Sequence, residues 1–365
     1  MDKNRKPSAL RAYTDELPRY VSAYILEYYN GESINTQIGY CIDIRVFLRY
    51  LKAAVFPEVE RIKDITTAHL DRVTASDLIS FKAYLREYEA ETVTPTGRRV
   101  MRVYRNSPYG VNRKMSAVRG LFIYLYKTDQ LRQNVTDKID FAKLHQKIKK
   151  PLTTQETVRL INVIYHGENY YEGRFLTEYK NRRLRDIAIF TTYLGTGIRV
   201  SELVNLNVED LDRDTQSFIV TRKGGDEQEI FMPLQVENAI CAYLGYTDED
   251  GNPLPRDTKT RETGPLFLSR SGNRMTAAGV EKLLKNYCLA AGITHPDKTR
   301  PHALRRTFAC RLLEDGVDIK MVAELMGHKN IEVTHRYYAQ YSAKARKEVM
   351  RSLEVLPKQE KSNED

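Results

Sequence analysis

Apolar residues recur at helical intervals along the first third of the chain. Between Leu17 and Leu51 they predict two successive helices, and two more are predicted over residues 74–88 and 112–126. The inward positions expected in these helices are Tyr20, Ile25, Tyr28, Tyr29, Ile42, Val46, Phe47, Leu51, Met115, Val118, Leu121, Phe122 and Leu125. The pattern therefore predicts a small helical bundle over residues 17–140, preceded by an N-terminal arm over residues 1–16.

Residues 91–110, ETVTPTGRRVMRVYRNSPYG, interrupt this helical pattern. Pro95 and Gly97 favour a turn, and the partial alternation of arginine with valine and tyrosine that follows favours a basic hairpin. A solvated basic loop explains the same charges, because basic runs usually face water. Both interpretations stay open.

A second domain is expected after the apolar periodicity weakens beyond Tyr126. Thr153 is a plausible helix cap, which predicts a linker over residues 141–152 and a domain over residues 153–355. This domain combines helices with a short hairpin, SFIVT and EIFMP, joined across residues 222–228. The expected fold is mainly α with a small antiparallel β-sheet, followed by a polar tail over residues 356–365.

Composition and charge narrow the class of protein. The 365 residues are 41% hydrophobic and 29% charged, a balance that supports two globular domains. A formal net charge of +10 favours a polyanionic partner. No apolar stretch approaches the roughly 20 residues that span a bilayer, and no secretory signal is recognisable, so a cytoplasmic protein without a membrane partner is expected. The cysteines at 41, 241, 288 and 310 lack C-x-x-C spacing, which favours reduced, buried thiols over a metal site or disulfides.

The first candidate for chemistry is Arg199. An expected helix over residues 182–194 stops at Gly195-Thr196-Gly197, where glycines permit a tight turn. This turn could hold the Arg199 guanidinium against two phosphate oxygens, with Glu202 orienting it. Taken alone, the motif favours an Arg–Glu pair that stabilises an ordinary helix start.

Two further motifs follow in the last quarter of the chain. His302 and Arg305 share one face of a helix that opens at Pro301, and a phosphate between them would relieve their like-charge repulsion. His328 follows the helix-ending Gly327, and Tyr337 stands nine positions later. A tyrosine needs a base or nearby cations to act as a nucleophile, because its ordinary pKa is near 10.

Together these motifs resemble those of the tyrosine recombinases, or phage-type integrases, and within them the Xer-like resolvases and transposon integrases. GTGIRVSEL is similar to the first arginine motif, HALRRTFA to the His-x-x-Arg box, and MGHKNIEVTHRYY to the final His and Tyr box. The resemblance covers residues 153–355 and continues more weakly into VNRKMSAVRGLFIYLYK. It implies a helical, SAM-like core-binding domain followed by an α+β catalytic domain.

The resemblance also implies roles for individual residues. Arg199 and Arg305 would clamp the scissile phosphate, His302 and His328 would hydrogen-bond to it, and Tyr337 would form a 3′-phosphotyrosyl bond. Lys223 matches the hairpin lysine that protonates the leaving 5′-hydroxyl, although Arg222 is adjacent. Met326 replaces a usual leucine, and Tyr338 directly follows the expected nucleophile. Residues expected to contact DNA are Arg98, Arg99, Arg102, Arg105, Arg113, Lys114 and Arg119.

The implied reaction needs no metal, ATP or other cofactor. The implied partner is double-stranded DNA that carries recombination sites. In the synaptic complex the protein is expected to form a homotetramer, which acts at the nucleoid. The helical segment after Ser342, with Val349, Met350 and Leu353 on its apolar side, is expected to dock on a neighbouring subunit. The sequence does not indicate whether the protein resolves chromosome dimers or moves an element. It also does not indicate an accessory protein, such as a DNA translocase or directionality factor.

Three other classes of protein share part of these features. A type IB topoisomerase shares the chemistry, but the helical first domain and short length count against it. A noncatalytic DNA-binding protein would have no reason to keep the full set from Arg199 to Tyr337. A metal-dependent nuclease would need clustered carboxylates or histidines at ligand spacing.

Overall fold

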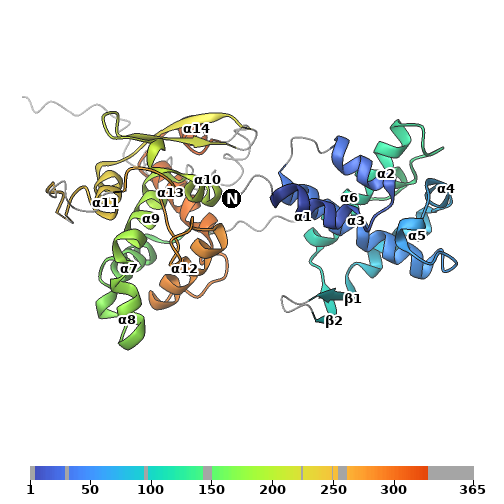
Figure 1. Cartoon of the computed structure of the whole chain (residues 1–365), viewed down its shortest axis with the longest axis horizontal. Helices are drawn as coiled ribbons and strands as arrows, with labels where there is room; N and C mark the ends of the chain where they lie inside the picture. Colours follow the sequence, from blue (N-terminus) through green and yellow to red (C-terminus); the bar gives the residue numbers. More distant parts are fainter. Residues whose placement is uncertain are drawn as a thin grey trace, which may run out of the picture. The chain divides into compact units, whose positions relative to one another are not determined.

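The computed structural model describes residues 5–28, 33–93, 98–142, 150–222, 225–248, 250–253 and 261–327. The chain divides into two compact units, Met1–Gln146 and Lys147–Asp365 (Figure 1). Both are dominated by helices, with small antiparallel sheets, as the expected fold class requires. In the described part, no helix is both long and apolar enough to cross a membrane.

The first unit is a helical bundle around an aromatic core. Its elements are α1 (Arg5–Thr14), α2 (Arg19–Ala23), η1 (Tyr24–Tyr28), α3 (Ile34–Ala54), η2 (Ile62–Asp64), α4 (Thr67–Asp71), α5 (Ala75–Tyr84), β1 (Glu87–Val93), β2 (Arg99–Arg105), α6 (Pro108–Lys127) and η3 (Val135–Lys138). The ring of Phe47 on α3 packs edge-on against Phe81 and Phe122, at centroid distances of 5.0 and 6.1 Å. The apolar stripe predicted for the helix over 112–126 is confirmed, since its five residues are all buried on α6.

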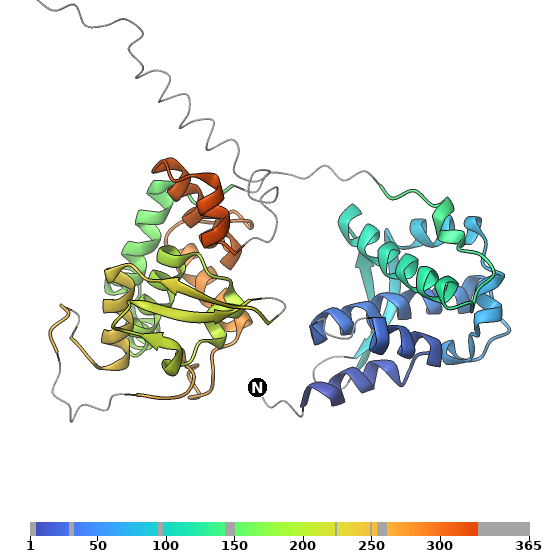
Figure 2. The ribbon, with the colours of Figure 1, turned by 90° about the horizontal axis from the view of Figure 1, so that it is seen from above.

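Helix α1 lies in the segment expected to form an N-terminal arm. It packs alongside α3, and Figure 2 shows the two blue helices next to each other. Leu10 is 7% exposed and belongs to the same apolar cluster as the α3 residues. In α3 the expected inward positions Phe47 and Leu51 are confirmed, but Ile42 and Val46 are only half-buried. The remaining buried apolar residues of this helix are Cys41, Ile44 and Leu48.

The hairpin interpretation of the segment after α5 is confirmed, but the hairpin is not basic. The third helix was expected to reach Tyr88 and instead ends at Tyr84, because EYEAETV alternates as a strand and pairs with β2. Tyr88 lies opposite Tyr104, and their rings stack with centroids 5.2 Å apart. The three glutamates of β1 equal the three arginines of β2 in number, although only Glu87 lies directly opposite one of them, Arg105.

The second unit surrounds α9 with helices and carries a three-stranded sheet. Its elements are α7 (Thr154–Tyr165), η4 (Gly167–Asn169), α8 (Gly173–Lys180), α9 (Arg183–Thr196), α10 (Val200–Asn205), η5 (Val208–Asp210), β3 (Leu211–Asp212), β4 (Ser217–Thr221), β5 (Glu227–Phe231), α11 (Leu234–Leu244), α12 (Ala277–Ala290), α13 (Pro301–Glu314) and α14 (Ile319–Leu325). Helix α9 packs against α7, α11 and α13. The strand order is β3–β4–β5, and the predicted β4–β5 hairpin is confirmed.

Local signals account for the ends of several elements in this unit. Thr153 caps α7 in a capping box with Glu156, as its position before the helix predicts. Pro301 is the first residue of α13, and Gly316 follows the helix with a positive φ of 84°. All four cysteines are buried and none forms a disulfide. The start of α10, the end of β4 and the end of α14 meet at one polar cluster.

Candidate active site

The turn between α9 and α10 is shaped by Gly197. This residue ends α9 in the left-handed conformation, with φ of 62°. A Cβ atom added here would lie 2.2 Å from Cδ1 of Phe308 on α13, so only glycine lets the two helices approach this closely. Arg199 follows as the N-cap residue of α10. The glycines predicted to form a tight turn therefore also bring Arg199 to the side of α13.

Glu202 holds Arg199 through two hydrogen bonds. The Arg199 backbone N–H donates to Oε2 and Arg199 Nη1 donates to Oε1, each at 2.7 Å. Glu202 is only 4% exposed. Burial raises the pKa of its carboxyl, but hydrogen bonds from Arg199 and the charges of Arg199 and Arg222 outweigh this and leave the pKa below its ordinary value. The carboxylate is therefore ionised at neutral pH, and its predicted partnership with Arg199 is confirmed.

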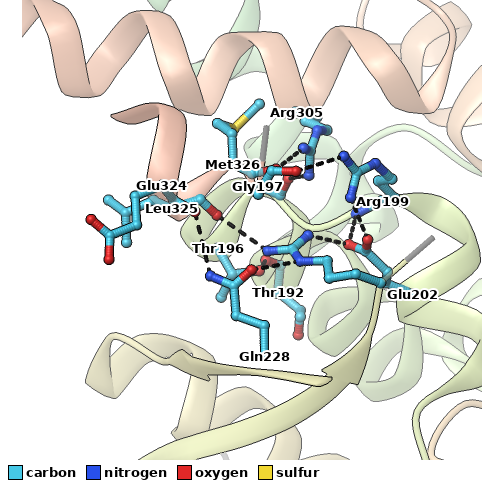
Figure 3. A network of polar contacts seen from close by, with 12 residues as sticks. Thr192, Thr196, Gly197, Arg199, Glu202, Gln228, Arg305, Glu324, Leu325 and Met326 are labelled. Carbon is cyan, nitrogen blue, oxygen red and sulfur yellow. Dashed lines mark hydrogen bonds and ion pairs between the residues drawn. The ribbon is translucent and has the colours of Figure 1, made fainter. Parts of the chain in front are cut away.

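Arg305 lies beside this pair and is 4% exposed on α13. Its Nη1 donates to the carbonyl oxygen of Gly197 at 2.5 Å, and its Nη2 donates to the carbonyl oxygen of Met326. Arg199 Nη2 donates to the next carbonyl along the chain, that of Gly327, at 3.1 Å. Figure 3 shows both guanidinium groups converging on the end of α14. Two arginines far apart in sequence thus share adjacent backbone acceptors.

Arg222 completes the cluster, and sequence reasoning did not assign it to the site. Its Nη1 donates to Glu202 Oε2 at 2.8 Å, and its Nε donates to Gln228 Oε1 at 2.7 Å. A signal for it does exist in the strand. Phe218 and Val220 point inward on β4 while Ile219 and Thr221 are exposed, so the period of two predicts that Arg222 also points inward. A buried arginine requires a partner, and Glu202 is that partner.

The structure places only some of the other expected site residues. His302 is exposed at the second position of α13, one turn before Arg305 on the same helix. Lys223, His328 and Tyr337 lie outside the described residues. Arg222 is the residue before Lys223, however, and Gly327 is the residue before His328. The described cluster therefore contains the chain neighbours of both.

The residues expected to contact DNA in the first unit fall into two groups. Arg98, Arg102, Arg105 and Arg113 are exposed, although Arg105 pairs with Glu87 at 2.9 Å and Arg113 with Asp43 at 2.8 Å; the Arg99 side chain lies outside the described residues.

Lys114 and Arg119 instead have internal partners. Lys114 is 8% exposed and its Nζ donates to Asn106 Oδ1 at 3.1 Å. Arg119 Nη2 donates to the carbonyl oxygens of Thr136 and Ile139, at 2.8 and 2.5 Å. Their expected role on DNA stays a prediction, although both side chains already have hydrogen-bond partners within the bundle.

Comparisons with known proteins show which family this chain belongs to. A model described as the phage integrase family matches residues 172–344. The tyrosine recombinase XerC of Natranaerobius thermophilus is 31% identical over 268 residues, which cover 73% of this chain and 78% of the relative. The chain belongs to the tyrosine recombinase family. XerC of Listeria monocytogenes serotype 4b is 29% identical to this recombinase over 269 residues, 72% of this chain and 84% of the relative. The recombinase is by class a site-specific DNA strand transferase.

Solved structures support the fold of the recombinase. The Tn1549 transposon integrase in complex with transposon right end DNA matches 91% of this chain and 99% of its own, with a TM-score of 0.61 and 22% identity. The XerH site-specific recombinase bound to difH in a post-cleavage complex matches 88% of this chain and 80% of its own, with a TM-score of 0.57 and 18% identity. The recombinase therefore has the same fold as these two solved structures.

Proposed function

We propose that this chain cleaves double-stranded DNA at paired sites through Tyr337 and rejoins the strands in a new combination, for chromosome dimer resolution or for integration and excision of a mobile element. The observation that carries the proposal is the convergence of Arg199 and Arg305 on the carbonyl oxygens of Gly327 and Met326. Two guanidinium groups fixed this close together form a site that suits a phosphate with two non-bridging oxygens.

In the proposed reaction the arginines neutralise charge that builds on the phosphorus. Tyr337 Oη gives its proton to solvent water and attacks the phosphorus, forming the 3′-phosphotyrosyl bond while the bond to the 5′-oxygen breaks. Lys223 supplies the proton that the departing 5′-oxygen takes up, and His302 and His328 hydrogen-bond to the phosphate. A 5′-hydroxyl from another strand then attacks the phosphotyrosyl ester and releases Tyr337. One phosphoester replaces another at each step, so the proposed chemistry needs no energy source.

We also propose a homotetramer on paired DNA sites, joined by the C-terminal segment. The second unit has an apolar groove of about 770 Å³ between α7, α9, α11 and α13, lined in part by Ile161, Leu194, Ala239, Phe308 and Leu312. The segment after Ser342 lies outside the described residues and carries Val349, Met350 and Leu353 at helical spacing. Its apolar side matches the groove in chemistry, so the segment of a neighbouring subunit is the proposed occupant.

Deleting residues 343–365 tests this assembly. The deletion should abolish complexes on paired sites and leave binding to a single site unchanged, and Leu312→Glu in the groove should do the same. Ile219→Glu, which alters an exposed apolar residue of β4, is the matched control. Intact synapsis in the deletion variant would refute the proposed docking.

The function itself is tested by strand exchange between two DNA sites taken from the locus that encodes the protein. Recombinant products from two duplexes are expected, and they should be lost in Arg199→Ala and Arg305→Ala. Relaxation of a supercoiled plasmid without exchange would instead assign a type IB topoisomerase-like activity. The proposal places the protein with its DNA at the nucleoid in the cytoplasm, where a translocase or directionality factor would be an additional partner.

A further inference from the structure

Arg222 lies at the point where the β4–β5 hairpin meets two other elements. On the hairpin, its backbone N–H donates to the carbonyl oxygen of Asp226 at 2.7 Å, and its carbonyl accepts from the Gly225 N–H at 3.1 Å. Its Nε donates across the hairpin to Gln228 Oε1 at 2.7 Å. The backbone and the side chain of Arg222 therefore join the end of β4 to residues 225, 226 and 228 on the other side of the hairpin.

The other end of the same side chain reaches α10 and α14. Nη1 donates to Glu202 Oε2 on α10 at 2.8 Å, and Nη2 donates to the carbonyl oxygen of Leu325 at the end of α14, at 3.4 Å. Gln228 adds a bond from its Nε2 to the carbonyl oxygen of Glu324, also at 3.4 Å. The guanidinium group of Arg222 thus ties the hairpin to α10 and α14. Arg222 as a whole is only 8% exposed.

Gly327 packs directly on this guanidinium group. The glycine has φ of 58°, and a Cβ atom added to it would lie 2.6 Å from Arg222 Cζ and 2.7 Å from its Nε. The end of α14 consequently rests on the flat face of Arg222, while the edge of the guanidinium donates to three acceptors. A lysine offers a single ammonium on a flexible stem and cannot reproduce this flat, forked arrangement.

We infer that Arg222 is a positioning residue that anchors the described residues on both sides of the β4–β5 connection to α10 and α14, and that Lys223 depends on this anchor for its role. The inference rests on the proposed function, in which Lys223 protonates the leaving 5′-oxygen. Arg199 depends less on Arg222, because Glu202 holds Arg199 within the same helix start. Loss of Arg222 should therefore affect proton donation more than phosphate binding.

A substrate that needs no proton donor tests this directly. Full-length protein is given two nicked duplexes of the same locus-derived site, one with an ordinary phosphodiester and one with sulfur replacing the leaving 5′-oxygen. A thiolate leaves without a proton, so this substrate bypasses Lys223. Arg222→Lys should form the covalent adduct about 100-fold more slowly than wild type on the ordinary substrate and within about tenfold of wild type on the sulfur substrate.

Two variants guard against simple loss of folding. Gln228→Ala removes one acceptor without burying an unpaired charge, and should slow only the ordinary substrate, by about fivefold. Arg185→Lys is the matched control: Arg185 is also largely buried and donates to Asp186 and to the Leu268 carbonyl. Arg185 lies about 18 Å along α9 from Gly197, so it should not change the ratio between the two substrates.

The outcomes separate the inference from the function. Equal slowing of both substrates by Arg222→Lys and Gln228→Ala would overturn the positioning role. Lys223→Ala should give the same selective defect as Arg222→Lys, and an equal defect on both substrates would remove Lys223 as proton donor. If wild type forms no adduct with either substrate, the proposed function fails and the inference falls with it.

Discussion

Glu202 holds Arg199 at both ends of the residue, accepting its backbone N–H and its Nη1 at 2.7 Å each. The same carboxylate accepts from Arg222 at 2.8 Å. One buried negative charge therefore compensates two arginines, and the geometry of the site depends on it. The carboxylate aims the Arg199 side chain at the end of α14, where Arg305 also donates.

Replacing Glu202 with glutamine keeps the shape of the side chain but removes this charge. Glu202→Gln should lower the free energy of unfolding by about 3 kcal/mol, because two arginines lose their charged acceptor in a buried setting. Adduct formation should fall at least tenfold. Urea unfolding and a cleavage assay measure the two effects. Glu87→Gln, which breaks an exposed pair with Arg105, should change neither.

The same residue predicts a pH dependence of stability. The pKa of Glu202 is lowered in the folded protein from an ordinary value of 4.5, so its contribution is complete above that value. As the pH falls from about 4.5 through the lower folded pKa, the carboxylate is protonated and the contribution is lost. The stability difference between wild type and Glu202→Gln should thus be constant near neutral pH and shrink in acid. A difference that grows as the pH falls would contradict this account of Glu202.

Gly327 offers a comparison between two glycines with positive φ. Gly327→Ala should be severely destabilising and prevent cleavage, since its Cβ would lie 2.6 Å from Arg222 Cζ. Gly316→Ala also has to adopt a positive φ, of 84°, but its Cβ would meet nothing within 4 Å. It should lose only about 1–2 kcal/mol in thermal or urea unfolding and keep its activity. Similar behaviour of the two variants would show that contact with Arg222 is unimportant.

The charges of the first unit divide into DNA-facing candidates and structural ones. Arg102 is exposed on β2, so Arg102→Gln should leave stability unchanged and reduce the salt dependence of DNA binding by about one unit of slope. Lys114→Met should do the opposite: it strips Asp43, itself 1% exposed, of one of its cations and should lower the free energy of unfolding by about 3 kcal/mol. Unchanged affinity and salt slope after neutralising Arg98, Arg102 and Arg105 together would remove the hairpin from the DNA interface.

The sequence patterns were most informative where one period or one turn residue decides the structure. The apolar stripe of α6 is predictable because burial on one helix face produces a periodic pattern of apolar residues. The turn at Gly197 is predictable because a left-handed backbone favours glycine. The partners of Lys114 and Arg222 are harder to predict from sequence patterns, since Asp43 and Glu202 lie far away along the chain. The start of β1 at Glu87 and Tyr88 differs from the expected helix, because the alternation of glutamate with tyrosine and alanine begins directly after the end of α5.

The site was predicted as a set of residues but not as a network. The convergence of Arg199 and Arg305 depends on how α9, α13 and α14 pack, which no spacing within a single motif encodes. The resemblance of the motifs predicts which residues belong to one site. The structure adds the carbonyl oxygens of residues 326 and 327, to which Arg305 and Arg199 respectively donate, and it adds Arg222 to the cluster. The catalytic roles stay predictions for the whole set, which consists of Arg199, Lys223, His302, Arg305, His328 and Tyr337.

The central claim is most directly tested by trapping the covalent intermediate. Full-length protein is incubated with a nicked duplex of the locus-derived site, so that cleavage releases a short strand and cannot reverse. The account predicts a covalent protein–DNA adduct in wild type and in Tyr338→Phe, and none in Tyr337→Phe. An adduct that persists in Tyr337→Phe, or folded and DNA-bound wild type that forms none, would contradict it.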